Sequence, residues 1–221
     1  MVDVLTQIDA VTRTLSTEDV DGEAMRIQTI TQSYPAGIDD VWDATTTAER
    51  IQRWFLPVVG DLRVGGRYQL TGNASGEILS CTPPANGSAN YSVTWEFAGG
   101  VTWLSVRLTS LDAQRTRFEL SHRSRVADIP DEMWETFGPG ATGVGWDQGL
   151  LGLALHLGAQ DSRISPEEGL EWALSDEGKA FARASADRWA EAYVAAGADP
   201  DVAARTAAAT FGFYTGQTPG A

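Results

Sequence analysis

Three glycines in the segment FGPGATGVG, residues 137–145, have the spacing of a phosphate-binding loop. Gly138, Gly140 and Gly143 form G-x-G-x-x-G just ahead of an expected helix. In dinucleotide-binding proteins this spacing follows a parallel strand, and an acidic residue lies further along the chain. Here the preceding MWETF is expected to be helical, and no strand pattern follows. We therefore interpret the spacing as a coincidence and expect these glycines to ease the start of a packing helix.

A few polar side chains have the types that catalysis requires. His122 is expected at the inward end of a strand, as a general base or, in the interpretation we favour, as a hydrogen-bonded core residue. Arg107 would bind a ligand carboxylate if its strand face is concave and would be solvated if that face is convex. Glu96 and Asp147 are carboxylates that would lie either near the cavity or, in the interpretation we favour, on a face exposed to solvent. The sequence gives no convincing nucleophile–base pair, so we name no catalytic residue.

The residues that commonly bind metals are scarce. The chain has two histidines and one cysteine, Cys81, and they show no spacing typical of a metal site. A single cysteine also excludes an internal disulfide. We expect neither a bound metal nor a cofactor.

The composition favours one sizeable globular domain with an acidic surface. The chain has 221 residues, 43% of them hydrophobic, with eight tryptophans and a formal charge of −14. This charge repels nucleic-acid phosphates and anionic membranes, so we expect neither as a partner. No apolar run is long enough to span a bilayer, and the N-terminus MVDVLTQIDAV lacks the features of a signal peptide. We therefore expect a cytoplasmic location.

Alternating segments between residues 25 and 123 predict an antiparallel sheet. They follow one another with tight turns and without the intervening helices of βαβ units. Two short helices are expected after the first strand, and residues 46–49 have the form of a capping box. A long helix follows a short helical insert at 130–137, because Trp146, Leu150 and Leu153 recur at helical spacing. The expected strands are residues 25–34, 61–64, 67–71, 76–82, 91–98, 101–110 and 115–123.

An ordered series of short motifs gives a more specific prediction. The series consists of Val41-Trp42, Ala48-Glu49, Trp54-Phe55, DLRVGGRY at 61–68, Gly76-Glu77-Ile78, Thr82-Pro83-Pro84, TWEF at 94–97, TRFELSH at 116–122 and Gly145-Trp146. Together these motifs resemble the START-like SRPBCC superfamily, in particular the branch homologous to the C-terminal domain of the activator of the heat-shock-90 chaperone ATPase. The resemblance covers about residues 25–157. It implies an α+β helix-grip fold, in which a curved antiparallel sheet wraps around a long C-terminal helix and leaves a cavity between them.

The resemblance divides the chain into three parts. These are an N-terminal arm at residues 1–23, the helix-grip domain at 24–160 and a helical C-terminal extension at 161–221. The extension begins with a second capping box at 165–168 and continues with a helix at 176–196 and another from 199 that ends near Gly212 or Gly216. It would cover the cavity mouth or form a homodimer through its alanine-rich last helix, which carries Phe211, Phe213 and Tyr214.

The cavity is the expected functional site. Glycines such as Gly145, Gly149 and Gly152 would either leave room for a ligand or allow close helix–sheet approach, and both interpretations stay open. Aromatic residues would line the cavity or belong to the plain core. Trp134 lies in the insert and would be a mobile gate. The candidate ligand-binding residues are Trp54, Phe55, Trp95, Trp103, Arg107, Phe118, His122, Trp134, Trp146 and Leu150.

Three functions compete. The first is non-catalytic binding of a small apolar or aromatic molecule. The second is a cyclase or aromatase-like reaction in the same cavity, which requires His122, Arg107 or Glu96 to converge there. The third is a chaperone-accessory or stress-response role, which the family name alone suggests. We favour the first, and with it a protein that is not an enzyme.

Overall fold

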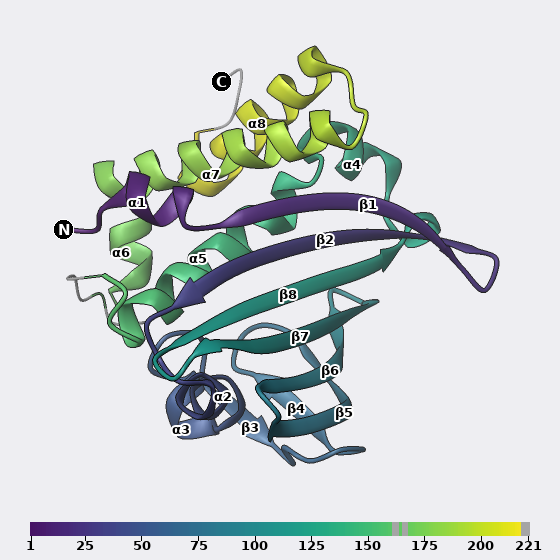
Figure 1. Ribbon diagram of the computed structural model, residues 1–221. Helices are drawn as coiled ribbons and strands as arrows, with labels where there is room; N and C mark the ends of the chain where they lie inside the picture. Colours follow the sequence, from purple (N-terminus) through teal and green to yellow (C-terminus); the bar gives the residue numbers. More distant parts are fainter. Residues whose placement is uncertain (161–163, 165–167, 218–221) are drawn as a thin grey trace.

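The computed structural model describes residues 1–160, 164 and 168–217. It contains one eight-stranded sheet in which every neighbouring pair of strands is antiparallel, in the order β1-β2-β8-β7-β6-β5-β4-β3. Figure 1 shows this sheet curving around the molecule. The strands are β1 Thr12–Val20, β2 Glu23–Tyr34, β3 Val58–Gly60, β4 Arg67–Leu70, β5 Ser75–Ala85, β6 Ser88–Phe97, β7 Gly100–Asp112 and β8 Arg115–Arg125.

The helices form two groups around the sheet. Two short helices lie at the β3 end, and the others follow β8 or precede β1. None of the helices in the described residues is both long and apolar enough to cross a membrane. Their bounds are α1 Val4–Asp9, α2 Ile38–Thr46, α3 Ala48–Ile51, the 3-10 helix η1 Val126–Asp128, α4 Asp131–Phe137, α5 Gly140–His156, α6 Gly169–Leu174, α7 Asp176–Ala195 and α8 Pro200–Thr215.

The first 23 residues differ from the expected arm. They form α1 and then β1, which pairs with β2 in continuous register from Thr12↔Thr31 to Val20↔Glu23. Asp21 and Gly22, both with positive φ, close this hairpin. An Asp-Gly pair in this conformation is typical of a two-residue hairpin turn. The N-terminal segment is therefore the edge strand of the sheet and the helix before it.

Two local predictions also need correction. Residues 61–64 are not a strand, because β3 precedes them at Val58–Gly60 and a loop leads to β4. The capping box at 46–49 is not formed: Thr47 is the N-cap of α3, and its hydroxyl donates to the Asp43 carbonyl. The predicted capping box at 165–168 lies almost entirely outside the described residues. The last helix agrees with the sequence, because Asp199 caps α8, Pro200 begins it and Gly216 ends it in the left-handed conformation.

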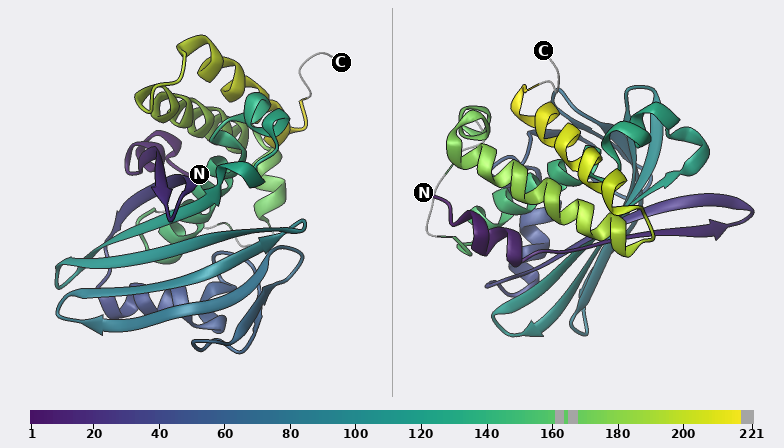
Figure 2. Two further views of the ribbon diagram at one scale, coloured as in Figure 1. Left: turned by 90° about the vertical axis from the view of Figure 1, so that its right-hand side faces the viewer. Right: turned by 90° about the horizontal axis from the view of Figure 1, so that it is seen from above.

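Helix α5 is the centre of the fold. Its sequence GATGVGWDQGLLGLALH contains one charged residue, Asp147, so the helix is apolar on nearly all sides. A helix of this kind must be covered all round. The sheet covers one side of α5, and α7 and α8 cover the other (Figures 1 and 2). The C-terminal extension therefore buries a second face of the gripped helix.

Two glycines of α5 allow close contacts with neighbouring elements. A Cβ atom on Gly143 would lie 2.3 Å from the Trp189 ring of α7, and one on Gly152 would lie 2.2 Å from the Trp54 carbonyl oxygen. Such distances exclude any larger residue unless the neighbours move. The glycines of the opening motif thus serve close packing against the extension, and an antiparallel sheet replaces the parallel strand of a dinucleotide site.

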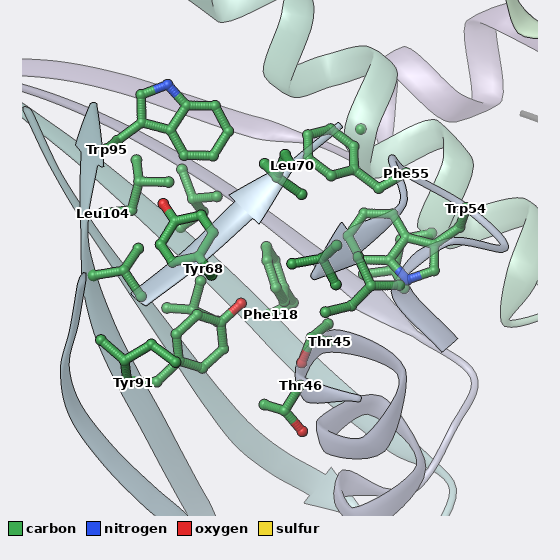
Figure 3. A pocket seen from close by; sticks show the side chains of 18 of the residues that line it. Thr45, Thr46, Trp54, Phe55, Tyr68, Leu70, Tyr91, Trp95, Leu104 and Phe118 are labelled. Carbon is green, nitrogen blue, oxygen red and sulfur yellow. The ribbon is translucent and has the colours of Figure 1, made fainter. Parts of the chain in front are cut away.

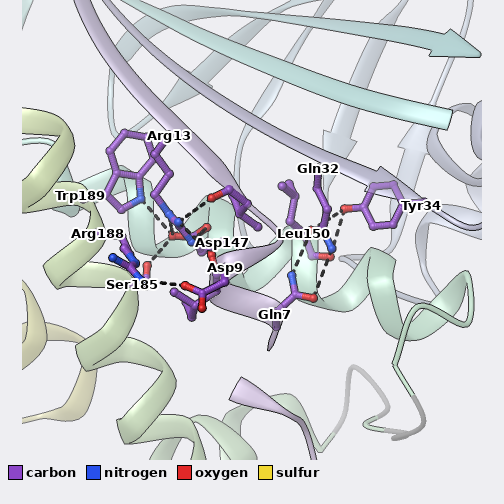
Figure 4. A network of polar contacts seen from close by, with 12 residues as sticks. Gln7, Asp9, Arg13, Gln32, Tyr34, Asp147, Leu150, Ser185, Arg188 and Trp189 are labelled. Carbon is purple, nitrogen blue, oxygen red and sulfur yellow. Dashed lines mark hydrogen bonds and ion pairs between the residues drawn. The ribbon is translucent and has the colours of Figure 1, made fainter. Parts of the chain in front are cut away.

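Asp147 joins three elements in a buried polar cluster (Figure 4). Its carboxylate accepts two hydrogen bonds from the Arg13 guanidinium of β1, at 2.9 and 2.8 Å. It also accepts hydrogen bonds from the Ser185 hydroxyl and the Trp189 indole of α7. The side chains of Arg13 and Asp147 are only 3% and 1% exposed. This cluster ties the edge strand, the gripped helix and the C-terminal extension together.

Candidate functional site

An inner cavity of about 160 Å³ lies between the concave face of the sheet and α5. Alternate residues of β7 and β8 point into it, including Leu104, Val106 and Phe118, while Leu150 and Leu153 of α5 face them. Figure 3 shows side chains from the strands, such as Tyr68, Leu104 and Phe118, converging with Thr45 and Thr46 from the end of α2. The cavity exists because the period of two along each strand sends one apolar set inward.

The few polar atoms at the inner cavity already have partners. Tyr68 donates its hydroxyl to the Thr94 carbonyl oxygen at 2.7 Å, and Thr45 donates to the Val41 carbonyl oxygen at 2.9 Å. Burial raises the pKa of Tyr68 and Tyr91, so both phenols stay protonated and neutral. The cavity is therefore apolar, and its lining suits an apolar molecule.

A wider outer cavity of about 570 Å³ adjoins the inner one. Its walls include Phe97 at the end of β6, Gln148 of α5, and Leu170 and Trp172 of α6 in the C-terminal extension. Five residues line both cavities and form the boundary between them, which we call the partition: Trp54, Phe55, Trp95, Trp146 and Gly149.

His122 holds one residue of the partition, Trp146, in place. The Trp146 indole N–H donates to His122 Nδ1 at 3.1 Å, so the proton of the neutral ring lies on Nε2, which is 2.7 Å from the Thr102 hydroxyl oxygen. Burial lowers the pKa of His122 to about 4. The ring is neutral near pH 7, and both of its nitrogens are engaged. This is the hydrogen-bonded core histidine that the sequence analysis favoured.

Most of the predicted site residues meet at these cavities. Trp54, Phe55, Trp95, Phe118, Trp146 and Leu150 line the inner cavity, and His122 lines the outer one. Whether they bind a ligand stays a prediction.

Three of the predicted residues lie elsewhere. Trp103 and Arg107 are on β7 but alternate with the inward-facing Leu104 and Val106, so they lie on the outer face of the sheet. The Arg125 guanidinium stacks over the Trp103 ring there at 4.7 Å. Trp134 of α4 lines neither cavity: its indole N–H donates to the Tyr193 hydroxyl at 2.9 Å, and it packs against α7 rather than forming a gate.

The sequence analysis did not predict the tyrosines that line the inner cavity. It also did not predict that the C-terminal extension forms part of the wall of the outer cavity. Tyr68 and Tyr91 alternate with exposed or half-buried residues on β4 and β6, and this alternation was a usable signal. Leu170 and Trp172 occupy a short helix with no pattern that points toward the cavity.

The polar residues considered for catalysis do not come together at one cavity. Glu96 is ion-paired with Arg67 at the surface, and Arg107 is exposed, so neither converges with His122. Among the described residues that line either cavity, none is an Asp, Glu, Lys or Arg. Within the same part of the chain, no three His, Cys, Asp or Glu side chains are grouped to hold a metal ion.

Solved structures show the same fold. The crystal structure of CalU16 from Micromonospora echinospora is 32% identical, covers 85% of this chain and 98% of its own, and has a TM-score of 0.60. The solution structure of CalU16 gives 30% identity and a TM-score of 0.64, with 85% and 97% coverage. A conserved protein of unknown function from Enterococcus faecalis, EF2215, is 14% identical over 88% of this chain and 96% of its own, with a TM-score of 0.58, and shows the fold alone.

The sequence comparison agrees with these structures. No protein of curated function matches the chain. Residues 35–158 match the family described as "Activator of Hsp90 ATPase homolog 1-like protein". The similarity to CalU16 spans more of the chain than this match, so it extends into the flanking segments. The helix-grip fold predicted from the motifs is confirmed, and the chain belongs to the Activator of Hsp90 ATPase homolog 1-like protein family.

Proposed function

We propose that this protein binds a small apolar or aromatic molecule, without catalysis, in the inner cavity between the sheet and α5. The observation that carries the proposal is a preformed apolar cavity of about 160 Å³ lined by residues of the buried core. Binding of an apolar ligand in such a cavity is favourable, because the ligand leaves water and fills empty space or displaces weakly held water.

A thermal-shift and calorimetric titration with naphthalene and indole tests this function. The variant Val106→Phe places a ring in the cavity, and Ser105→Phe places the same ring on the outer face at the neighbouring position of β7. We expect one molecule of ligand per chain in the natural protein and in Ser105→Phe, and loss of binding in Val106→Phe. Absence of binding in the natural protein, or equal loss in both variants, would refute the proposal.

A cyclase or aromatase-like activity has less support. It requires polar groups that converge on a ligand, whereas Arg107 lies on the other face of the sheet and His122 is neutral and engaged. Oxygen atoms of Thr45, Tyr68 and Tyr91 remain as acceptors at the inner cavity, but none has a neighbouring base.

Family membership favours an accessory role as the second candidate. The family is described by an activator of the Hsp90 ATPase, and binding of a small molecule is compatible with such a role. Measuring the ATPase rate of an Hsp90-class chaperone with and without this protein tests it. An unchanged rate at saturating protein would remove this candidate and leave ligand binding untouched.

A further inference from the structure

The inner and outer cavities share part of their walls. The five residues of the partition line both, so they lie where the apolar inner cavity and the wider outer cavity meet. The total space exceeds what a single aromatic ring system would fill. A ligand confined to the inner cavity would leave the outer one as unused apolar surface.

The partition has two rings held by hydrogen bonds and one residue without a side chain. Trp54 donates its indole N–H to the Ala44 carbonyl oxygen at 2.8 Å, and Trp146 donates to His122, so both rings are held in place. Gly149 contributes no side chain, and a Cβ atom there would lie 3.7 Å from the Phe55 ring. This distance is ordinary van der Waals contact, so the space between Gly149 and the Phe55 ring holds one methyl group, and the Phe55 ring must turn aside before a ligand chain can pass.

Hydrogen-bonding groups without partners lie on the outer side of the partition. Within the described residues, neither the Trp95 indole N–H nor the Gln148 side-chain amide has a hydrogen-bond partner. In Figure 3 the nitrogen of Trp95 points away from Tyr68 and the inner cavity. A ligand that spans the partition would therefore have apolar walls around its inner end and hydrogen-bonding groups beside its outer end.

The charges around the two cavities indicate which chemical class of ligand fits them. The described lining residues offer no cation for a carboxylate or phosphate and no anion for an amine. A buried charge without a partner is strongly disfavoured. The formal charge of −14 further disfavours anions near the mouth.

We propose that the two cavities form one bipartite site for a single uncharged, elongated molecule. Its apolar end occupies the inner cavity, its middle passes Gly149 with the Phe55 ring turned aside, and its hydrogen-bonding part lies in the outer cavity beside Trp95 and Gln148. This inference rests on the proposed function and specifies the ligand of the same site.

The C-terminal extension supplies one wall of the outer part. Leu170 of α6 lines the outer cavity although it is 74% exposed, and Phe97, 57% exposed, lies on the sheet side. Leu174, on the same helix and 50% exposed, lines neither cavity. These two leucines provide a matched pair of surface substitutions.

Two neutral fluorescent probes test the bipartite site. Prodan and laurdan share a dimethylaminonaphthalene ketone and differ only in acyl chain length. We expect laurdan to bind the natural protein at least about tenfold more tightly, because its chain reaches the inner cavity. Gly149→Leu should bring laurdan down to the affinity of prodan. Leu170→Ser should weaken laurdan about fivefold or more, and Leu174→Ser should leave it within about twofold.

The outcomes separate this inference from the proposed function. If naphthalene binds but laurdan and prodan bind equally, and Leu170→Ser has no effect, the bipartite site is wrong and the inner site stands. If naphthalene also fails to bind, both proposals fall. A cooperative unfolding transition of Gly149→Leu would show that this variant is folded. If the variant does not fold, the binding of laurdan to Leu170→Ser decides whether the bipartite site exists. Dodecanoate and dodecanol have the same chain length but differ in charge. Tighter binding of dodecanoate would contradict the inference that the ligand is uncharged.

Discussion

The two sides of helix α5 differ sharply in packing. On the sheet side, Gly149 and Leu153 face a cavity of about 160 Å³. On the other side, Gly143 touches the Trp189 ring and Asp147 lies in a fully buried cluster. The same helix therefore borders an open space on one side and a close-packed interface on the other.

The difference in packing suggests that the two sides of α5 serve different purposes, one for the stability of the fold and the other for ligand binding. An apolar hollow reduces the contacts that a core can make. Here the C-terminal extension and β1 stabilise the helix from its other side through apolar packing and the Asp147 cluster. Changes where α7 packs against α5 should thus mainly alter stability, and changes in the walls of the two cavities should mainly alter ligand binding.

The largest expected effect comes from breaking the buried cluster. Asp147→Ala leaves Arg13 charged and buried without its partner and also removes the acceptor of Ser185 and Trp189. We expect a loss of about 3–5 kcal/mol in the free energy of unfolding, measured by urea titration. The matched control is Asp187→Ala, which removes an exposed pair with Arg183 and should cost about 0.5 kcal/mol or less.

Replacing both partners sharpens this test. Arg13→Met combined with Asp147→Leu removes the uncompensated charge, so the double variant should be more stable than Asp147→Ala alone. A double variant that is equally unstable would show that packing, rather than the unpaired charge, dominates at this position.

The next effect is a pH dependence from His122. Its pKa is about 4 in the folded chain, below the ordinary 6.5, because burial disfavours the charged ring. The unfolded chain therefore binds a proton between these values that the folded chain does not. Stability is fully present above pH 6.5 and falls by about 3 kcal/mol as the pH drops toward 4.

The variant His122→Gln isolates this contribution. Glutamine can still accept from Trp146 and donate to Thr102, but it does not titrate. The difference in unfolding free energy between the two proteins should shrink or reverse between pH 6.5 and 4. A constant difference across this range would mean that His122 is not buried and neutral.

A smaller effect compares one substitution on the two sides of the helix. Gly143→Ala places a methyl group 2.3 Å from Trp189 and should destabilise by about 1–3 kcal/mol. Gly149→Ala meets only an ordinary contact and should stabilise by up to about 1 kcal/mol, because alanine favours the helix. Thermal unfolding of both variants checks the prediction, and shifts of the same sign would contradict the contrast in packing.

Much of the fold follows from local patterns in the sequence. The alternation of β8 and the helical spacing of Trp146, Leu150 and Leu153 predict the inner walls of the cavity, as the structure has them. Strand β1 was missed because TRTLSTEDV is polar on both faces and pairs with only one neighbour.

Other features depend on contacts that no local pattern reveals. Asp147 is the one charge in an apolar helix, but its partner Arg13 lies 134 residues away in that unrecognised strand. Strand β7 carries apolar residues on both faces, so alternation alone does not decide whether Trp103 or Leu104 points inward. Whether the space beside Leu153 is hollow depends on the summed volumes of many side chains.

Methyl NMR during a titration with naphthalene tests the hollow side of α5 most directly. We predict saturable shifts for the methyl groups of Leu104, Val106 and Leu153, which line the inner cavity. The methyl groups of Val144 and Ala207, packed on the extension side, should not move. No shift at saturation of the probe, or shifts confined to Val144 and Ala207, would contradict a ligand site between the sheet and the helix.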